Sequence, residues 1–123
     1  MQITLHFNSS EFDCKDGTNV PLVYKDNMVI LAHQLETIRE ASGGAIKVNS
    51  GFRTPSYNKK IGGASNSFHM RCMAADIVSS VLSPKKLGTL ILQLIADGKI
   101  KAGGVKIYSS WVHYDIRGKL TKF

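Results

Sequence analysis

The segment Ser67-Phe68-His69-Met70-Arg71-Cys72-Met73-Ala74-Ala75-Asp76 decides how this chain folds. It places one histidine and one aspartate within a sequence whose other side chains are mostly unreactive. The residues that follow His69 become apolar and β-branched, which predicts a buried strand over residues 73–80 that carries Asp76. Gly62-Gly63 predicts the loop that leads to His69. We expect the rest of the chain to hold this segment in place.

Two long helices are expected, one before this strand and one after it. Asp26 or Asn27 can cap the first, which runs to about residue 41 and is ended by Gly43-Gly44. Ser83-Pro84 opens the second, and Gly98 ends it. Their apolar residues recur at helical spacing: Met28, Leu31, Ala32, Leu35 and Ile38 in the first, and Leu87, Leu90, Ile91, Leu94 and Ile95 in the second.

Short strands are expected over residues 45–49, 103–108 and 111–117, the last two joined at Ser109-Ser110. Residues 1–7 alternate between apolar and polar side chains, which predicts a short edge strand or an extended arm. Helices and strands interleave along the sequence. We therefore predict one α+β domain over residues 1–123, in which a small, mainly antiparallel sheet packs with two main helices.

The composition narrows the classes of partner. The 123 residues carry a formal net charge of +7, which favours an anionic partner. The basic residues are scattered, with no run of four, so a nucleic-acid partner is not expected. The apolar runs are far shorter than the roughly 20 residues that span a bilayer, and no leader peptide is recognisable. We expect a monomer without membrane insertion.

Cys14 and Cys72 are the only cysteines, too few for a disulfide scaffold. Two free thiols are the favoured interpretation, and the sequence leaves a bridge between them open. His33 lies off the apolar stripe of the first helix, so we expect it at the surface rather than at a metal.

Alternation along residues 111–117 assigns the side chains of the last strand to two faces. Val112, Tyr114 and Ile116 suit the core, and the opposite face receives Trp111, His113, Asp115 and Arg117. Catalytic zinc sites use three His or Asp/Glu ligands and keep a fourth position open. His69, Asp76 and His113 supply such a set, although their spacing alone is a weak signal.

The segment from Ser67 to Asp76 resembles the S-x-H-x-x-G-x-A-x-D motif of the D-Ala-D-Ala-peptidase family of zinc enzymes. That family includes D-Ala-D-Ala carboxypeptidases, vancomycin-resistance dipeptidases and phage L-alanyl-D-glutamate endolysins. Ser50-Gly51-Phe52-Arg53-Thr54 is similar to the family's S-G-[FY]-R segment, and residues 103–118 resemble the closing hairpin of its small single-domain branch. The resemblance covers nearly the whole chain and implies a hedgehog/D-Ala-D-Ala-peptidase-like fold.

Carried over by position, the resemblance implies that His69, Asp76 and His113 bind Zn2+. It implies that Arg53 holds a carboxylate or carbonyl oxygen of the substrate, and that Ser67 hydrogen-bonds the substrate. Two aromatic residues of the last hairpin are further candidates. Tyr108 is either an oxyanion donor or a packing residue, and Trp111 either stacks on the substrate or forms the pocket wall.

The sequence departs from the family pattern at two positions. The family glycine three residues after the first histidine is Cys72 here, which is strained if that backbone needs a positive φ. The acidic general base found in many members is replaced by Ser110. Asp115 is the nearest substitute as base, and its alternative role is to orient a ligand histidine or to pair with Arg117.

We therefore expect a zinc metallopeptidase that hydrolyses an amide bond in peptidoglycan stem peptides. The bond is left open between D-Ala-D-Ala and L-Ala-D-Glu. The alternative is a catalytically inactive, zinc-containing cell-wall-binding module or phage structural component, suggested by Ser110 at the usual base position. A leaderless enzyme of this type is expected to be made in the cytoplasm and to act on the cell wall, as phage or prophage products do.

Overall fold

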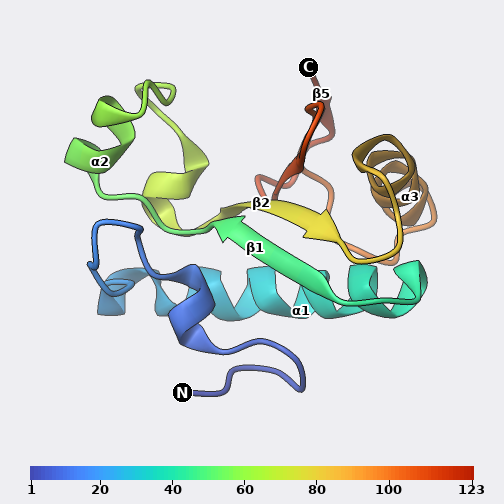
Figure 1. The fold of residues 1–123 in the computed structure, drawn as a ribbon, viewed down its shortest axis with the longest axis horizontal. Helices are drawn as coiled ribbons and strands as arrows, with labels where there is room; N and C mark the ends of the chain where they lie inside the picture. Colours follow the sequence, from blue (N-terminus) through green and yellow to red (C-terminus); the bar gives the residue numbers. More distant parts are fainter.

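The computed structural model describes residues 1–123 and is built around one five-stranded sheet with the order β1-β2-β4-β3-β5 (Figure 1). The strands are β1 (Ile46–Ser50), β2 (Ala74–Ser79), β3 (Gly104–Ile107), β4 (Val112–Asp115) and β5 (Thr121–Lys122). Neighbouring strands are antiparallel except for β5, which runs parallel to β3. The predicted α+β fold with a mainly antiparallel sheet is confirmed.

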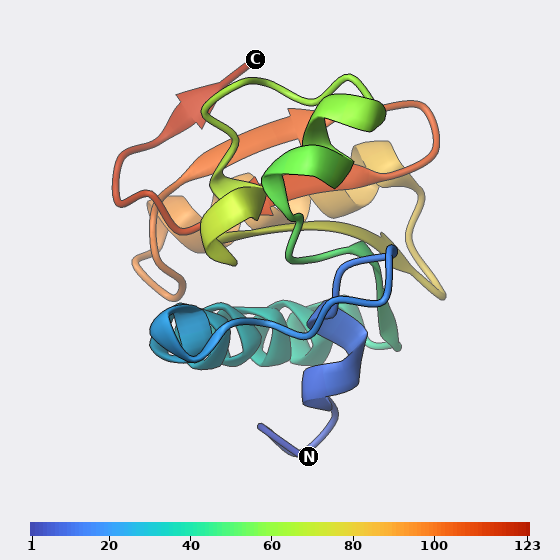
Figure 2. The same ribbon diagram turned by 90° about the vertical axis from the view of Figure 1, so that its left-hand side faces the viewer.

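Three α-helices and three short 3-10 helices surround the sheet. They are α1 (Lys25–Ser42), α2 (Pro55–Lys60), α3 (Pro84–Ala96), η1 (Ser9–Phe12), η2 (Leu22–Tyr24) and η3 (Phe68–Arg71). The two long helices α1 and α3 contact each other and the sheet. Figure 2 shows α2 and η3 in front of the strands, with α3 behind them and α1 along the lower edge. None of the helices combines the length and the apolar composition needed to cross a bilayer.

Local capping signals explain where α3 begins and why the prediction for it was accurate. The Ser83 hydroxyl accepts a hydrogen bond from the backbone N–H of Lys86 at 3.3 Å, and Pro84 occupies the first turn. Gly98 follows the helix with a positive φ of 71°. These signals are contained within the segment itself.

The predicted start of α1 was wrong, because neither Asp26 nor Asn27 caps it. The helix begins at Lys25, after Tyr24, which makes no side-chain cap. The Asn27 amide instead donates to the backbone carbonyl of Arg71 at 3.0 Å and so ties α1 to η3. The predicted end is confirmed, since Gly43 has φ 78° and its N–H bonds to the last turn.

The core lies between the sheet and the two long helices. Alternation along the strands gives it Ile77 of β2 and Val112 and Tyr114 of β4, all fully buried as predicted for the last strand. Behind them, α1 contributes Met28, Leu31, Ala32, Leu35 and Ile38, and α3 contributes Leu87, Ile91 and Leu94. The opposite face of β2 and β4 is therefore free to carry polar side chains.

Residues 1–7 do not form a strand of the sheet, so of the two predicted alternatives, a short edge strand and an extended arm, the edge strand is wrong. Their only pairing is an isolated bridge between Gln2 and Asn8. Asn8 and Glu11 form a capping box that turns the chain into η1. This turn buries Phe7 and Phe12 with ring centroids 6.2 Å apart, and leaves Leu5 77% exposed.

Both cysteines are buried and free, as favoured by the sequence. Cys72 has φ 56° and is the only residue other than glycine with a positive φ. The backbone at this position therefore does require the left-handed conformation that the family glycine adopts easily. Burial raises the pKa of the Cys72 thiol to about 12, so the thiol stays protonated at neutral pH.

Candidate metal centre

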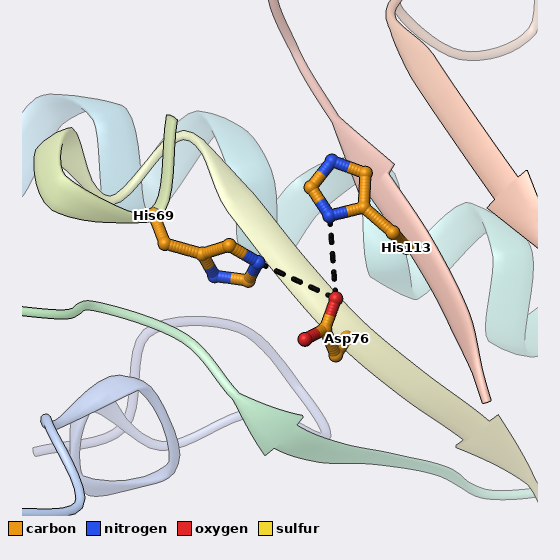
Figure 3. A group of neighbouring side chains, drawn as sticks. All are labelled: His69, Asp76 and His113. Carbon is orange, nitrogen blue, oxygen red and sulfur yellow. Dashed lines mark hydrogen bonds and ion pairs between the residues drawn. The ribbon is translucent and has the colours of Figure 1, made fainter. Parts of the chain in front are cut away.

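Three side chains from three different elements converge on one point above the polar face of the sheet. They are His69 of η3, Asp76 of β2 and His113 of β4, and one ligand atom from each lies within 4.8 Å of the others. Asp76 and His113 are direct partners across the antiparallel β2–β4 pair. Figure 3 shows both rings directed at the same oxygen of Asp76. The structure thus brings together the set that the sequence predicted.

The turn that carries His69 is fixed at both ends. The Ser67 hydroxyl caps η3 by accepting from the backbone N–H of His69 at 3.2 Å. The left-handed Cys72 ends η3 and directs the chain into β2. Between them, the His69 carbonyl accepts from the backbone N–H of Arg53 at 3.0 Å. Ser67 is therefore occupied with its own backbone, although it also lines the pocket.

The outer nitrogen of each ring is held by an acceptor. His69 Nδ1 lies 2.8 Å from the carbonyl oxygen of Gly51, and His113 Nε2 lies 2.8 Å from Oδ2 of Asp115. A carbonyl and an ionised carboxylate can only accept, so both outer nitrogens carry the hydrogen. In the neutral rings, the inner nitrogens therefore present lone pairs to the centre.

Three electron-pair donors consequently face one another at the centre. His69 Nε2 lies 3.3 Å and His113 Nδ1 lies 3.2 Å from Oδ1 of Asp76. A metal ion at the centre would stabilise this grouping, because it accepts all three electron pairs. Zinc–ligand distances of about 2.0–2.1 Å in a tetrahedron place neighbouring ligand atoms about 3.3 Å apart. The donor set and these two separations therefore fit a zinc ion with one open position.

The electrostatics of the centre favour an ionised carboxylate. Burial raises the pKa of Asp76, but hydrogen bonds and charge from His113 and His69 outweigh it and hold the pKa below the usual range. Burial lowers the pKa of His69. Burial also acts to lower the pKa of His113, but its hydrogen bonds to Asp115 and Asp76 outweigh this and the pKa is raised.

Arg53 hydrogen-bonds directly to one of the three converging side chains, Asp76. Its Nη2 donates to Oδ2 of Asp76 at 3.0 Å, while Nε and Nη1 donate to Ser50 at 3.1 Å and to Asn58 at 3.3 Å. These bonds orient the Asp76 carboxylate so that its other oxygen faces the two histidines. Arg53 also lines the pocket, so a substrate oxygen can reach the guanidinium.

Asp115 is buried beneath His113 and is not a pocket-lining residue. Five donors surround its two oxygens, which offer about four lone-pair sites. They are the backbone N–H groups of Gly104 and Arg117, Nε and Nη2 of Arg117, and Nε2 of His113. Glycine is required beside it, because a Cβ at Gly104 would lie 2.4 Å from Oδ2 of Asp115. This environment suits the orienting role better than the role of base.

A pocket of about 380 Å³ opens above the three converging side chains. Tyr108 lines it, whereas Trp111 stacks behind Tyr108 with ring centroids 4.3 Å apart and does not line it. Ser110 is exposed at the turn of the hairpin, outside the lining. Arg117, which alternation placed on the same face as His113, lines the pocket, and the lining residues that the sequence reasoning missed include Phe68, Lys106 and Phe123.

A signal for one of the missed residues was present in the sequence. A two-residue turn at Ser109-Ser110 fixes the register of the hairpin, because it pairs each residue with the one equally distant from the turn. Lys106 must then lie opposite His113, as observed. The Gly51 carbonyl gave no such signal, since a backbone acceptor leaves no trace in residue type.

Comparison with known proteins agrees with this geometry. The family model described as Peptidase M15 matches residues 5–115. A zinc D-Ala-D-Ala carboxypeptidase from Streptomyces albus G is 37% identical over 71 residues, a match that covers 57% of this chain and 28% of that protein. The chain thus matches little more than a quarter of that relative's length. The family match and the donor set both indicate zinc, and the chain belongs to the Peptidase M15 family.

Proposed function

We propose that the protein is a zinc-dependent metallopeptidase that hydrolyses an amide bond in peptidoglycan stem peptides. The observation that carries the proposal is the convergence of two imidazole nitrogens and a carboxylate oxygen at the floor of an open pocket. Family membership supports a peptidase, and the relative named as a D-Ala-D-Ala carboxypeptidase supports a cell-wall peptide as the substrate.

In this proposal His69, Asp76 and His113 hold the metal. Zinc, when bound, lowers the pKa of a coordinated water toward about 7 and polarises a carbonyl group. The residues around it prepare the site before substrate arrives. Arg53 fixes the rotation of the Asp76 carboxylate, and the Gly51 carbonyl and Asp115 fix the two imidazole rings.

The same proposal assigns roles to the pocket wall. The Arg53 guanidinium faces the pocket and can donate to a substrate oxygen through N–H groups that the protein leaves unused. The Tyr108 side chain also lines the pocket, and its hydroxyl is a candidate donor to the oxyanion. Asp115 acts through His113 as a positioning residue, since its oxygens are already filled by protein donors.

A second candidate function is a zinc-containing wall-binding module without catalysis. The observation that favours it is the absence of any pocket-lining carboxylate other than Asp76, which is committed to the metal centre. This candidate predicts bound zinc and affinity for cell walls, with no peptide released at any pH.

The deciding experiment measures zinc content and release of peptide from purified muropeptides. We expect one zinc per chain and cleavage by the wild type, and loss of both in His113→Ala. His33→Ala, which removes an exposed histidine of α1, is the matched control and should retain both. Mass spectrometry of the fragments tells whether the D-Ala-D-Ala or the L-Ala-D-Glu bond is cut. Equal cleavage by wild type and His113→Ala would refute the proposal, and zinc without cleavage would favour the binding module.

A further inference from the structure

Lys106 is the charged pocket-lining residue that has no role in the chemistry described so far. It lies on β3 directly opposite His113 of β4. Facing residues of an antiparallel pair project to the same side of the sheet with Cβ atoms about 4.5–5.5 Å apart. The Lys106 side chain therefore enters the pocket immediately beside a predicted metal ligand.

The charges of the pocket single out this lysine. Three cationic side chains line the pocket: Arg53, Lys106 and Arg117. Arg53 forms an ion pair with Asp76 at 3.0 Å, and Arg117 forms one with Asp115 at 2.8 Å. Lys106 forms no ion pair with any carboxylate in the structure and no side-chain hydrogen bond. It is therefore the cation of the pocket whose charge no carboxylate of the protein balances.

Aromatic rings hold the Lys106 ammonium group in place. Its Nζ lies 4.9 Å from the centre of the Tyr108 ring and 6.0 Å from that of Phe123. Trp111 stacks on Tyr108 with ring centroids 4.3 Å apart, so the ring that supports Lys106 is itself fixed. Cation–π contacts of this kind orient an ammonium group while leaving its N–H donors available to a ligand.

We propose that Lys106 binds the α-carboxylate of the substrate residue whose amino group is released by cleavage. The inference rests on the proposed peptidase function. In both candidate bonds this residue carries a free α-carboxylate, terminal in D-Ala-D-Ala and left free by the γ-linkage in L-Ala-D-Glu. That carboxylate is three bonds from the scissile carbonyl carbon, within about 4 Å. Lys106 lines the same pocket as the three converging side chains and lies across the strand pair from His113, so its ammonium group is on the side of the sheet where this carboxylate would lie.

The test compares substrate pairs that differ only in this group. For whichever bond the wild type cleaves, steady-state kinetics are measured on two peptides. One carries the free α-carboxylate (the acid), and in the other this carboxylate is converted to the α-amide (the amide). The wild type should prefer the acid by about tenfold or more in kcat/KM. Lys106→Gln should lose this preference through a higher KM for the acid, with kcat little changed and the amide unaffected. Lys106→Arg should restore much of the preference.

A binding measurement on the zinc-depleted full chain gives a readout that does not depend on turnover. The Kd of the peptide with the free α-carboxylate should be about tenfold lower for the wild type than for Lys106→Gln. Lys85→Gln, which removes an exposed lysine of α3, is the control and should behave like the wild type. If the wild type cleaves neither bond, the peptidase proposal fails and this inference with it. If the wild type cleaves and Lys106→Gln keeps the full preference for the acid, the inference alone is overturned.

Discussion

His69 and His113 point at the same carboxylate oxygen, yet different groups hold the two rings. A backbone carbonyl, that of Gly51, accepts from His69, whereas the buried carboxylate of Asp115 accepts from His113. The first acceptor is neutral and comes from the chain just after β1. The second is charged and sits two residues from His113 on the same strand.

This difference has an electrostatic consequence. A carbonyl orients the ring, while a carboxylate also adds negative charge and makes the imidazole more basic. The pKa values move in opposite directions accordingly. Burial lowers the pKa of His69, whereas for His113 the bonds to Asp115 and Asp76 outweigh burial and raise it. We infer that His113 is the stronger metal donor and that proton competition is greatest there.

The largest effect is expected from removing either ring. His69→Ala and His113→Ala should each weaken zinc binding by more than about a hundredfold, because each removes one of the three proposed ligands. Competition with a chromophoric chelator measures the affinity. The comparison predicts the greater loss for His113→Ala. A greater loss for His69→Ala would contradict the ranking, and His33→Ala provides the baseline.

The next largest effect on zinc affinity is expected from removing the negative charge of Asp115, the acceptor of the His113 hydrogen bond. Asp115→Asn keeps the size of the side chain and an oxygen acceptor, but removes the negative charge. We expect zinc affinity to fall by about 10–100-fold, the range typical of groups that orient a metal ligand. Circular dichroism and a urea melt should accompany the titration, because Arg117 also loses its ionic partner. Unchanged zinc affinity in a folded variant would show that the carboxylate acts no differently from a carbonyl.

A smaller effect is expected in the pH dependence of zinc binding. Zinc binds neutral imidazole, so the raised pKa of His113 makes affinity fall as the pH drops through that pKa, by about tenfold per pH unit below it. Above the raised pKa this competition is absent. In Asp115→Asn the pKa of His113 should be lower, so the decline should begin at lower pH than in the wild type. Identical pH profiles would show that Asp115 contributes no charge effect.

The smallest effect concerns the turn that carries His69. Alanine normally stabilises a protein relative to glycine, but at φ 56° the order should invert. We expect Cys72→Gly to be more stable than Cys72→Ala by about 1 kcal/mol, since both lose the buried sulfur and only glycine relieves the strain. Urea unfolding of the two variants measures the difference. Alanine as the more stable variant would mean that the left-handed turn carries no strain.

Local signals made much of the fold predictable. Ser83-Pro84 and Gly98 delimit α3, and alternation along β4 separates Tyr114 from His113, so both were predicted correctly. Of the two alternatives predicted for residues 1–7, the edge strand is wrong because the segment folds back on itself, and the backbone N–H groups of Ile3 and Thr4 both donate to the Phe7 carbonyl. The two-residue β5 was missed because it is too short to show any alternation.

The candidate site was predictable where residue types carry the information. His69, Asp76 and His113 are recognisable by their chemistry and by resemblance, and the structure brings them together. The role of Asp115 could not be decided from sequence, because it depends on how many donors surround the carboxylate once it is buried. Trp111 was assigned to the site face by alternation, but stacking on Tyr108 keeps it out of the lining.

The position of Phe123 has a practical consequence for handling the protein. This residue lines the pocket, and its ring lies edge-on to His113 with centroids 6.1 Å apart. The N-terminus lies on the opposite side of the molecule, beyond α1 (Figure 1). A purification tag or fluorophore joined after Phe123 emerges at the rim of the pocket, and a polyhistidine tag there would compete for the metal. Labels for binding assays and surface immobilisation therefore belong at Met1.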